Sequence, residues 1–335
     1  MNKFTPFSSI SVIGGGAWGT ALAHLCAENG VPTLLWAREQ DVVDAVTERN
    51  ENTVYLPGVS LSPALQATSD LSKSAKSEAF LFVVPAQHSR VVLSSLKEYA
   101  AETTPIALCS KGIERNTGLL MTEVLSEVWP EARAAVLSGP SFAKDVAQGL
   151  PTAVTLACGD EVAEKWLATI GAAHFRPYVS SDLLGAELGG AIKNVLAIAA
   201  GVVAGKGLGE SAKAALIARG FTEFQRLGVA LGAEAQTMAG LSGLGDLILT
   251  ASSPQSRNMS LGLELGKGRA LKTILAERNS VSEGVATAEA VIALARKANI
   301  EMPICEAVAD LVNERKTIDD IIAGLLARPF KSEAK

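Results

Sequence analysis

Glycines near the start of the chain have a spacing that suits phosphate binding. Gly14, Gly16 and Gly19 give the pattern G-x-G-x-x-G, directly after the apolar run SISVI and before a helical pattern. In this context Gly14 would allow a tight turn, Gly16 a close approach of backbone to a pyrophosphate, and Gly19 close packing of helix on strand. The free amides at the helix N-terminus would face the phosphates. The pattern predicts dinucleotide binding, and an ordinary strand-to-helix turn is the alternative.

An arginine follows the second apolar run, TLLW, where dinucleotide-binding folds distinguish their cofactors. An acidic residue there would bind the ribose 2′-hydroxyl of NAD, whereas a guanidinium fits the 2′-phosphate of NADP. Arg38 occupies this position, and the small Ala37 before it leaves room. The sequence therefore predicts NADP as the preferred cofactor. Glu39 keeps NAD open, and a solvated surface charge is the alternative for Arg38.

Two lysines occupy positions at which they could bind a ligand or exchange a proton. Lys111 follows the run IALC, and ligands bind at the carboxyl ends of parallel strands. Lys193 and Asn194 interrupt an apolar helical stretch just after Gly189 and Gly190. A glycine pair inside a helix indicates a closely packed neighbour, for which a cofactor is a candidate. A desolvated lysine can exchange a proton near neutrality. The alternatives are a surface residue for Lys111 and a snorkelling side chain for Lys193.

A third cluster follows the motif GLGDLILT. Asp246 and Thr250 are four residues apart, so one face of a helix could present both. Ser256 can cap the next helix, with Arg257 and Asn258 in its first turn. An arginine at a helix N-terminus makes a suitable phosphate site. A surface turn and a plain capping motif are the alternatives.

The elements that would position these residues change character along the chain. In the first half, continuous apolar runs alternate with helical stretches, which indicates strands buried on both faces. This pattern predicts a Rossmann-type, doubly wound parallel sheet. The predicted strands are 9–13, 33–36, 79–84, 106–109, 134–137 and 153–157, with helices at 17–29 and 41–49.

From about residue 182 onward the chain is rich in Ala, Leu and Gly and has almost no β-type runs. We therefore predict an N-terminal dinucleotide-binding domain over 1–185 and an all-helical, substrate-binding domain over 186–335. Ser181 and Asp182 can cap a long first helix of this second domain. The predicted helices are 182–204, 211–231, 258–266, 285–298, 304–313 and a short one from 317.

Composition limits the possible classes of protein. The chain has 335 residues, 48% hydrophobic and 19% charged, which excludes a disordered chain and suggests about two domains. Mean hydropathy is +0.25, but the most apolar stretch, 195–205, is too short for a membrane span and predicts a buried helix. A net charge of −5 and a pI near 5.4 argue against a nucleic-acid or membrane partner.

The cysteines and the N-terminus point to a reducing environment. Cys26, Cys109, Cys158 and Cys305 are far apart, and the chain has only three histidines, so neither a disulfide framework nor a metal site is expected. We expect buried thiols. The segment MNKFTPFSSI has no signal-peptide pattern, which predicts a cytoplasmic location.

Several motifs follow one another along nearly the whole chain. They are GGGAWGTALA (14–23), LLWAR (34–38), SKGIE (110–114), LSGPSFAKD (137–145), LPTAV (150–154), LGGAIKNVLAIAAG (188–201), GLGDLILT (243–250), QSRN (255–258) and SEG (282–284). No single motif is specific, but together they resemble the bacterial type of NAD(P)-dependent glycerol-3-phosphate dehydrogenase. The resemblance implies reduction of dihydroxyacetone phosphate to sn-glycerol 3-phosphate, a precursor of phospholipids, by a homodimer.

The resemblance also implies roles for individual residues. Lys193 would be the proton donor and acceptor, oriented by Asp246, while Lys111 would contact both cofactor and substrate. Asn194 and Thr250 would complete the catalytic set. The implied substrate contacts are Lys111, Gly139, Ser141, Lys193, Asp246, Ser256, Arg257 and Asn258. The implied cofactor contacts, besides the glycines, are Ala17, Trp18, Arg38, Lys111, Ala143, Arg257, Val281 and Glu283.

Two other functions remain open from the sequence. A related two-domain dehydrogenase of the 3-hydroxyacid or 6-phosphogluconate type would also use a lysine on a helix, but would act on a carboxylate. A non-catalytic NADPH sensor would need only the glycine loop, so the Lys193 and Arg257 clusters argue against it.

Overall fold

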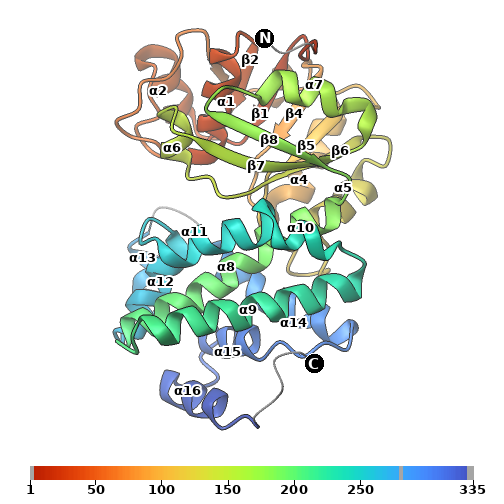
Figure 1. The fold of residues 1–335 in the computed structure, drawn as a ribbon. Coiled ribbons are helices and arrows are strands. Elements are labelled where there is room, and N and C mark those ends of the chain that lie inside the picture. Colours follow the sequence, from red (N-terminus) through yellow and green to blue (C-terminus); the bar gives the residue numbers. More distant parts are fainter. Residues whose placement is uncertain (1–3, 279–281, 330–335) are drawn as a thin grey trace. The chain divides into compact units, whose positions relative to one another are not determined.

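The computed structural model describes residues 4–278 and 282–329. The chain forms two compact units (Figure 1). The first unit contains Met1–Gly190 with Ala233–Asp246, and the second contains Ala191–Gly232 with Leu247–Lys335. These units differ from the predicted domains, 1–185 and 186–335, mainly because the segment 233–246 returns to the first unit. The assignment of dinucleotide binding to 1–185 and of substrate binding to 186–335 remains a prediction.

The first unit is built on one sheet, which has eight strands in the part of the chain that the structure describes. Their order is β3-β2-β1-β4-β5-β6-β7-β8, and every neighbouring pair is parallel except β6 and β7. The predicted doubly wound sheet is confirmed, with this one antiparallel pair and with β3 and β8 as strands that the apolar runs do not reveal. The strands are β1 (Ile10–Ile13), β2 (Thr33–Trp36), β3 (Gln66–Thr68), β4 (Ala79–Phe82), β5 (Pro105–Leu108), β6 (Arg133–Ser138), β7 (Thr152–Cys158) and β8 (Phe175–Ser180).

Helices cover both faces of this sheet (Figure 1). In β4, Ala79 and Leu81 pack into the core on one face, while Phe80 and Phe82 pack into the core on the other. This explains why the sequence shows continuous apolar runs instead of alternation. The first face carries α1 (Ala17–Glu28), α2 (Gln40–Arg49), α6 (Ala143–Ala147) and α7 (Asp160–Ile170), and the second carries α3 (Leu71–Ser74), α4 (Ala86–Lys97) and α5 (Met121–Val128).

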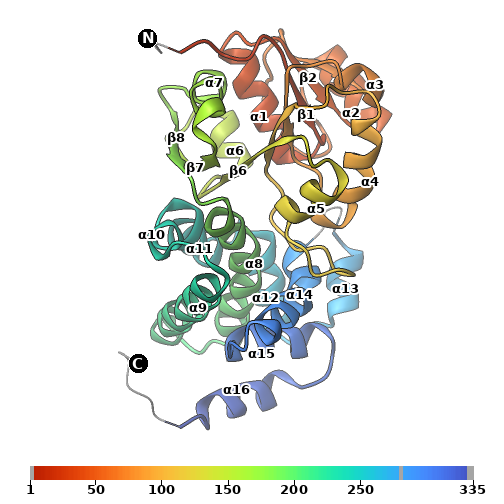
Figure 2. The ribbon, with the colours of Figure 1, turned by 90° about the vertical axis from the view of Figure 1, so that its right-hand side faces the viewer.

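In the described residues of the second unit, helices are the only regular secondary structure (Figure 2). All six helices predicted for this half are present, with ends within about two residues of the expected positions. The boundary between the units falls inside the long helix α8 (Leu183–Gly205), and α10 (Ala235–Ala239) and the π-helix η1 (Leu241–Gly245) belong to the first unit. The other helices are α9 (Glu210–Leu231), α11 (Asp246–Ser252), α12 (Arg257–Gly266), α13 (Leu271–Ala276), α14 (Glu283–Lys297), α15 (Pro303–Val312) and α16 (Ile318–Leu326).

Glycines on two helices let their backbones touch inside the second unit. Gly201 and Gly205 lie one turn apart on α8, and Gly262 and Gly266 lie one turn apart on α12. A Cβ atom at Gly201 would collide with the carbonyl oxygen of Met259, and one at Gly262 would meet the Cα of Gly201 at 3.0 Å. The high glycine content of these helices therefore serves close packing.

Helix α8 is long and apolar enough to cross a membrane by length and composition alone, but 89% of its most apolar window is buried inside the protein. The predicted buried helix is confirmed. The four cysteines are likewise buried and free, as the sequence predicts. Among the described residues, no group of His, Cys, Asp and Glu side chains is placed to hold a metal ion.

Candidate active site

The glycine loop has the geometry that its spacing predicts. Gly14 has a φ of 127°, a conformation that favours glycine, and a Cβ there would meet the carbonyl oxygen of Val83 at 2.9 Å. A Cβ at Gly19 would collide with the carbonyl oxygen of Gly14. Gly16 caps α1, and no described atom lies within 4 Å of the place its Cβ would take. The backbone of Gly16, directly before the first turn of α1, is therefore accessible to a ligand.

Two observations at this loop fit a bound dinucleotide. The open position at Gly16 leaves space against the backbone, where a pyrophosphate would need it. The indole Nε1 of Trp18 is buried and has no hydrogen-bond partner among the described residues. A buried donor of this kind calls for an acceptor, because leaving it unpaired costs about 1–3 kcal/mol.

A buried asparagine that the sequence analysis did not single out supports the loop from behind. The Nδ2 atom of Asn52 donates to the carbonyl oxygen of Gly15 and to Oγ1 of Thr20, both at 2.8 Å. Asn52 is fully buried. Its contact with the loop spans 37 residues of sequence, so no local spacing could have revealed it.

Arg38 lies two residues beyond the end of β2, as the sequence predicts for a residue that selects the cofactor. Its side chain is 77% exposed, and both Nε and Nη2 donate to Oε1 of Glu39, at 3.1 and 2.7 Å. The guanidinium is thus available at the surface but engaged by its acidic neighbour.

In the first unit, Lys111 contacts other residues that were predicted for the site. Its Nζ lies 3.0 Å from Oδ2 of Asp246 and 3.4 Å from the carbonyl oxygen of Gly139. The carboxylate of Asp246 is almost completely buried. Ser141 donates from Oγ to the same carbonyl oxygen of Gly139 at 3.0 Å, and Ala143 begins α6 just beyond. An ammonium group, a carboxylate and a hydroxyl therefore converge at the carboxyl end of the sheet.

The predicted close neighbours of the glycine pair in α8 are protein groups. A Cβ at Gly189 would collide with the carbonyl oxygen of Ser242. A Cβ at Gly190 would meet Oγ of Ser138 at 3.1 Å and Cγ of Lys111 at 3.4 Å. Gly190 therefore gives the stem of Lys111 room to lie against α8.

In the second unit, Lys193 is buried with an exposed fraction of only 6%. Its Nζ donates to Oγ1 of Thr250 at 3.0 Å. Beside it, Oδ1 of Asn194 accepts from Nδ2 of Asn258 at 2.9 Å, and Oδ1 of Asn258 accepts from the backbone amide of Gly284 at 3.2 Å. The structure thus joins residues from α8, α11, α12 and α14 into one polar cluster. A lysine that is held by a buried hydroxyl is not a snorkelling surface residue.

The predicted cap of α12 is confirmed. Oγ of Ser256 accepts from the amide of Met259 at 3.2 Å, and Arg257 begins the helix. Glu283 is likewise the first residue of α14, with Ser282 as its N-cap. Val281, which the resemblance assigns to the cofactor, lies outside the described residues.

Another residue missed by the sequence analysis is Glu187, one turn before Gly190 on α8. Its carboxylate accepts from the amide and the hydroxyl of Thr122 at 3.0 and 2.6 Å, at the start of α5. Burial raises the pKa of this carboxyl to about 7. The glutamate inside the apolar run LGAELGG is the sequence signal that could have identified it.

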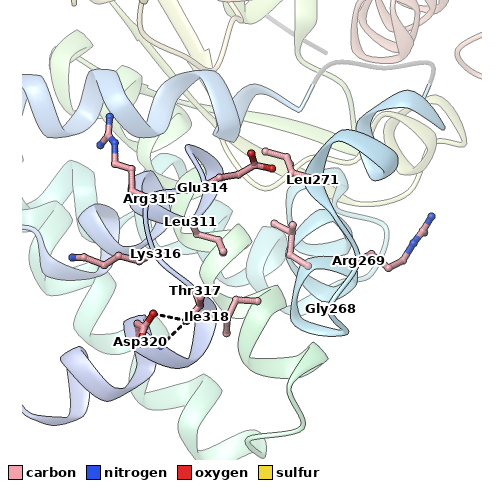
Figure 3. Close-up of a pocket in the computed structure, with 11 residues that line it drawn as sticks. Gly268, Arg269, Leu271, Leu311, Glu314, Arg315, Lys316, Thr317, Ile318 and Asp320 are labelled. Carbon is pink, nitrogen blue, oxygen red and sulfur yellow. Dashed lines mark hydrogen bonds between the residues drawn. The ribbon is translucent and has the colours of Figure 1, made fainter.

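A cavity in the second unit is lined by residues of α12, α13, α15 and α16 (Figure 3). It has a volume of about 640 Å³ and an apolar floor that includes Leu265, Leu311 and Ile318. The cations on its rim are already paired, Arg269 with Glu264 and Glu277, and Arg315 with Glu289. None of the predicted site residues lines it.

The fold and these clusters define a class of protein, a dinucleotide-dependent dehydrogenase. Comparison with known families agrees. The model of the NAD-dependent glycerol-3-phosphate dehydrogenase N-terminus matches residues 9–164, and that of the C-terminus matches residues 182–323. The chain belongs to this family.

Individual relatives cover almost the full chain. It is 58% identical to the glycerol-3-phosphate dehydrogenase [NAD(P)+] of Parvibaculum lavamentivorans over 328 residues, 98% of each chain. It is 57% identical to the protein of the same name from Maricaulis maris, again over 98% of each chain. The crystal structure of glycerol-3-phosphate dehydrogenase from Coxiella burnetii is similar with a TM-score of 0.92 and 38% identity, covering 96% of this chain and 99% of that one.

Proposed function

We propose that this protein reduces dihydroxyacetone phosphate to sn-glycerol 3-phosphate, reversibly, with NADPH or NADH. The observation that carries the proposal is the buried Lys193, whose Nζ is held by Thr250, in a chain that both family models match. A desolvated ammonium group beside a substrate carbonyl can stabilise the developing charge on oxygen and donate a proton to it.

In the proposed reaction, each of these residues has its own task. The nicotinamide cofactor, when bound, would supply the hydride. Lys193 donates the proton to the carbonyl oxygen, and Thr250 orients its ammonium group. Lys111, paired with Asp246, adds positive charge, and Asn194 adds a hydrogen bond. The predicted orientation of Lys193 by Asp246 remains part of this proposal.

The substrate phosphate would bind at the start of α12. Arg257 and Asn258 occupy the first turn there, and Ser256 caps it. The amides of a helix N-terminus and a guanidinium both favour an anion. Gly139 and Ser141 are the further substrate contacts that we propose. Holding the phosphate fixes the ketone relative to the reacting groups, which can contribute several kcal/mol to catalysis.

The cofactor would be held by residues of the glycine loop and its surroundings. The amides of Ala17 and Trp18 would face the pyrophosphate, and Arg38 would pair with a 2′-phosphate, so we propose NADP as the preferred cofactor. The further contacts that we propose are Lys111, Ala143, Arg257, Val281 and Glu283.

The test is the loss of NADPH absorbance with dihydroxyacetone phosphate, repeated with NADH and with unphosphorylated dihydroxyacetone. Turnover that requires the phosphate supports the proposal. Activity on 3-hydroxy acids or 6-phosphogluconate alone would replace it with a carboxylate-directed dehydrogenase. Tight NADPH binding without turnover on any ketone phosphate or hydroxy acid would indicate a sensor.

Assembly and cellular role belong to the same proposal. We propose a cytoplasmic homodimer whose product supplies phospholipid synthesis. Light scattering during size-exclusion chromatography would measure the mass, and a monomer at micromolar concentration would contradict the dimer.

A further inference from the structure

Asn52, in the connection between α2 and β3, uses every hydrogen-bonding group of its side chain. Nδ2 donates to the carbonyl oxygen of Gly15 and to Oγ1 of Thr20, both at 2.8 Å, and Oδ1 accepts from the amide of Tyr55 at 3.0 Å. Because the Tyr55 amide can only donate, Oδ1 must face it, and the two donors must face the glycine loop. The amide is therefore fixed in one orientation.

This contact constrains the loop through the geometry of the peptide bond. In a planar trans peptide, the carbonyl of one residue and the amide of the next point in opposite directions. The carbonyl of Gly15 points toward Asn52, so the amide of Gly16 points away from it. That amide belongs to the residue with open space at its Cα. Asn52 therefore determines the direction of a donor in the phosphate loop.

We propose that Asn52 is a positioning residue that preorganises the Gly16 amide for the cofactor pyrophosphate. The inference rests on the proposed function only in naming NADPH as the ligand. Asn52 does not touch the ligand itself; it prevents the Gly15–Gly16 peptide from rotating, so binding does not have to order it. Rigid donors aimed at an anion bind it more tightly than donors that must reorganise.

Asn52→Asp tests this inference because it keeps the shape and the acceptor for Tyr55. The ionised carboxylate has no donor for the carbonyl oxygen of Gly15 and would repel it, whereas the Thr20 hydroxyl can turn to donate to the carboxylate. The Gly15–Gly16 peptide therefore loses its anchor to residue 52. We expect NADPH to bind at least tenfold more weakly at pH 8. At pH 6 the affinity should partly recover, since burial raises the pKa of a carboxyl and a protonated carboxyl can donate to the Gly15 oxygen.

Two further variants separate positioning from general damage. Asn52→Ala removes the anchor without adding charge, so it should weaken NADPH binding at both pH values equally. Thr20→Val keeps the 2.8 Å bond from Asn52 to Gly15, and removes an acceptor for Asn52 and a long bond, 3.4 Å, from Oγ1 of Thr20 to the Gly15 carbonyl oxygen. It should change the affinity by less than about threefold, and by less than Asn52→Ala, because the shorter bond to Gly15 stays. Affinities are measured by calorimetry on the full-length protein, with circular dichroism confirming that each variant is folded.

The ligand series completes the test. Adenosine 2′-phosphate lacks the pyrophosphate, so its affinity should be the same in the wild-type protein and the Asn52 variants. Unchanged NADPH binding in both variants, or an equal loss for adenosine 2′-phosphate, would overturn the inference. A wild-type protein that binds NADPH but does not reduce dihydroxyacetone phosphate would overturn the proposed function and leave the Asn52 comparison decisive.

Discussion

Each of the two lysines proposed for the site has a defined hydrogen-bond partner in its own unit. The Nζ atom of Lys111 lies 3.0 Å from the buried carboxylate of Asp246, and the Nζ atom of Lys193 donates to the hydroxyl of Thr250. The side chain of Lys193 is also almost completely buried. Burial and hydrogen bonding hold its ammonium group in a defined position, which suits the proton donation that we propose for Lys193.

Replacing Lys193 with alanine should therefore affect the chemical step. We expect Lys193→Ala to lower kcat by about 10²–10⁴, the usual contribution of general acid–base catalysis, while NADPH affinity stays within about twofold. Steady-state kinetics and cofactor titration measure the two quantities. A variant with nearly normal kcat would exclude Lys193 as the proton donor.

The Arg38–Glu39 pair makes a prediction about cofactor choice. Glu39 competes with a 2′-phosphate for the guanidinium and repels it, so Glu39→Gln should raise the ratio of kcat/KM for NADPH over NADH by about threefold to tenfold. Arg38→Gln should lower the same ratio.

The two substitutions control for each other because they change neighbouring residues in opposite directions. If both shift the ratio in the same direction, or neither shifts it, Arg38 does not select the cofactor.

Single residues can be predicted from the sequence when their structural role depends on the spacing of near neighbours. The glycine loop, the Ser256 cap and the placement of Asp246 and Thr250 one turn apart on a helix each depend on a few consecutive positions. Asn52 and Glu187 are different, because their partners lie 37 and 65 residues away. A single polar residue has no spacing to interpret, and only the folded chain shows what it binds.

Among the elements, α8 and α12 contain glycines in their interiors, a position that most helices avoid, and their close packing depends on these glycines. Glycine inside a helix costs about 1 kcal/mol relative to alanine. The cost is offset here because the backbones of the two helices are in contact at Gly201 and Gly262. Since α8 carries Lys193 and α12 carries Arg257, this packing also fixes the spacing of two proposed functional residues.

Adding a methyl group at this contact should destabilise the protein. Gly201→Ala would place its Cβ against the carbonyl of Met259, and overpacking of this kind costs about 1–3 kcal/mol, more than the gain in helix propensity. Gly324→Ala in α16 is the matched control, because no described atom lies within 4 Å of its Cβ position. It should stabilise the protein by up to about 1 kcal/mol.

Urea unfolding measures both free energies. The packing argument would be wrong if Gly201→Ala were as stable as Gly324→Ala.

The predicted helices and strands both end close to their observed positions, and most of the elements that the sequence did not reveal are short. Helix ends carry local signals, such as the Ser256 cap of α12 and the Ser181–Asp182 pair before α8. Helices α10 and α13 have only five and six residues, too few for a clear helical pattern. Strand β3 has three residues, and β8 contains Arg176 and Pro177 at the edge of the sheet, so neither has an apolar run. The antiparallel pairing of β6 with β7 could not be predicted either, because the apolar pattern of a strand does not show in which direction the strand runs in the sheet.

Across the whole molecule, two buried glutamates, one in each unit, accept hydrogen bonds from the first turn of another helix. Glu187 accepts from Thr122 at the start of α5, and Glu223 accepts from the amides of Ile304 and Cys305 at the start of α15. In both, burial raises the pKa of the carboxyl to about 7. Each is therefore partly protonated near neutral pH.

This predicts how stability depends on pH. The folded protein holds these protons up to about pH 7, whereas glutamates of the unfolded chain release them near their ordinary pKa of 4.5. The folded state thus binds more protons between these values, and stability falls as pH rises through them, by at most about 3 kcal/mol per carboxyl. Glu187→Gln and Glu223→Gln should each reduce this fall.

Urea unfolding at about pH 5 and pH 8 measures the difference for the wild type and both variants. The two effects should add, since the residues lie in separate units. An identical difference in all three proteins would show that neither carboxyl titrates in this range.

The assignment of 233–246 to the first unit has a consequence for recombination between related genes. A crossover at the codon for Gly190 joins the sheet of one parent to an α10–η1 segment of the other. Side-chain contacts join these two parts, because a Cβ at Gly185 would meet the Cβ of Thr237 at 3.2 Å and Lys111 pairs with Asp246. A hybrid that also transfers 233–246 keeps both sides of these contacts from one parent. Functional chimeras should therefore require two exchanged segments, and single-crossover hybrids of distant parents should be depleted from any library selected for stable protein.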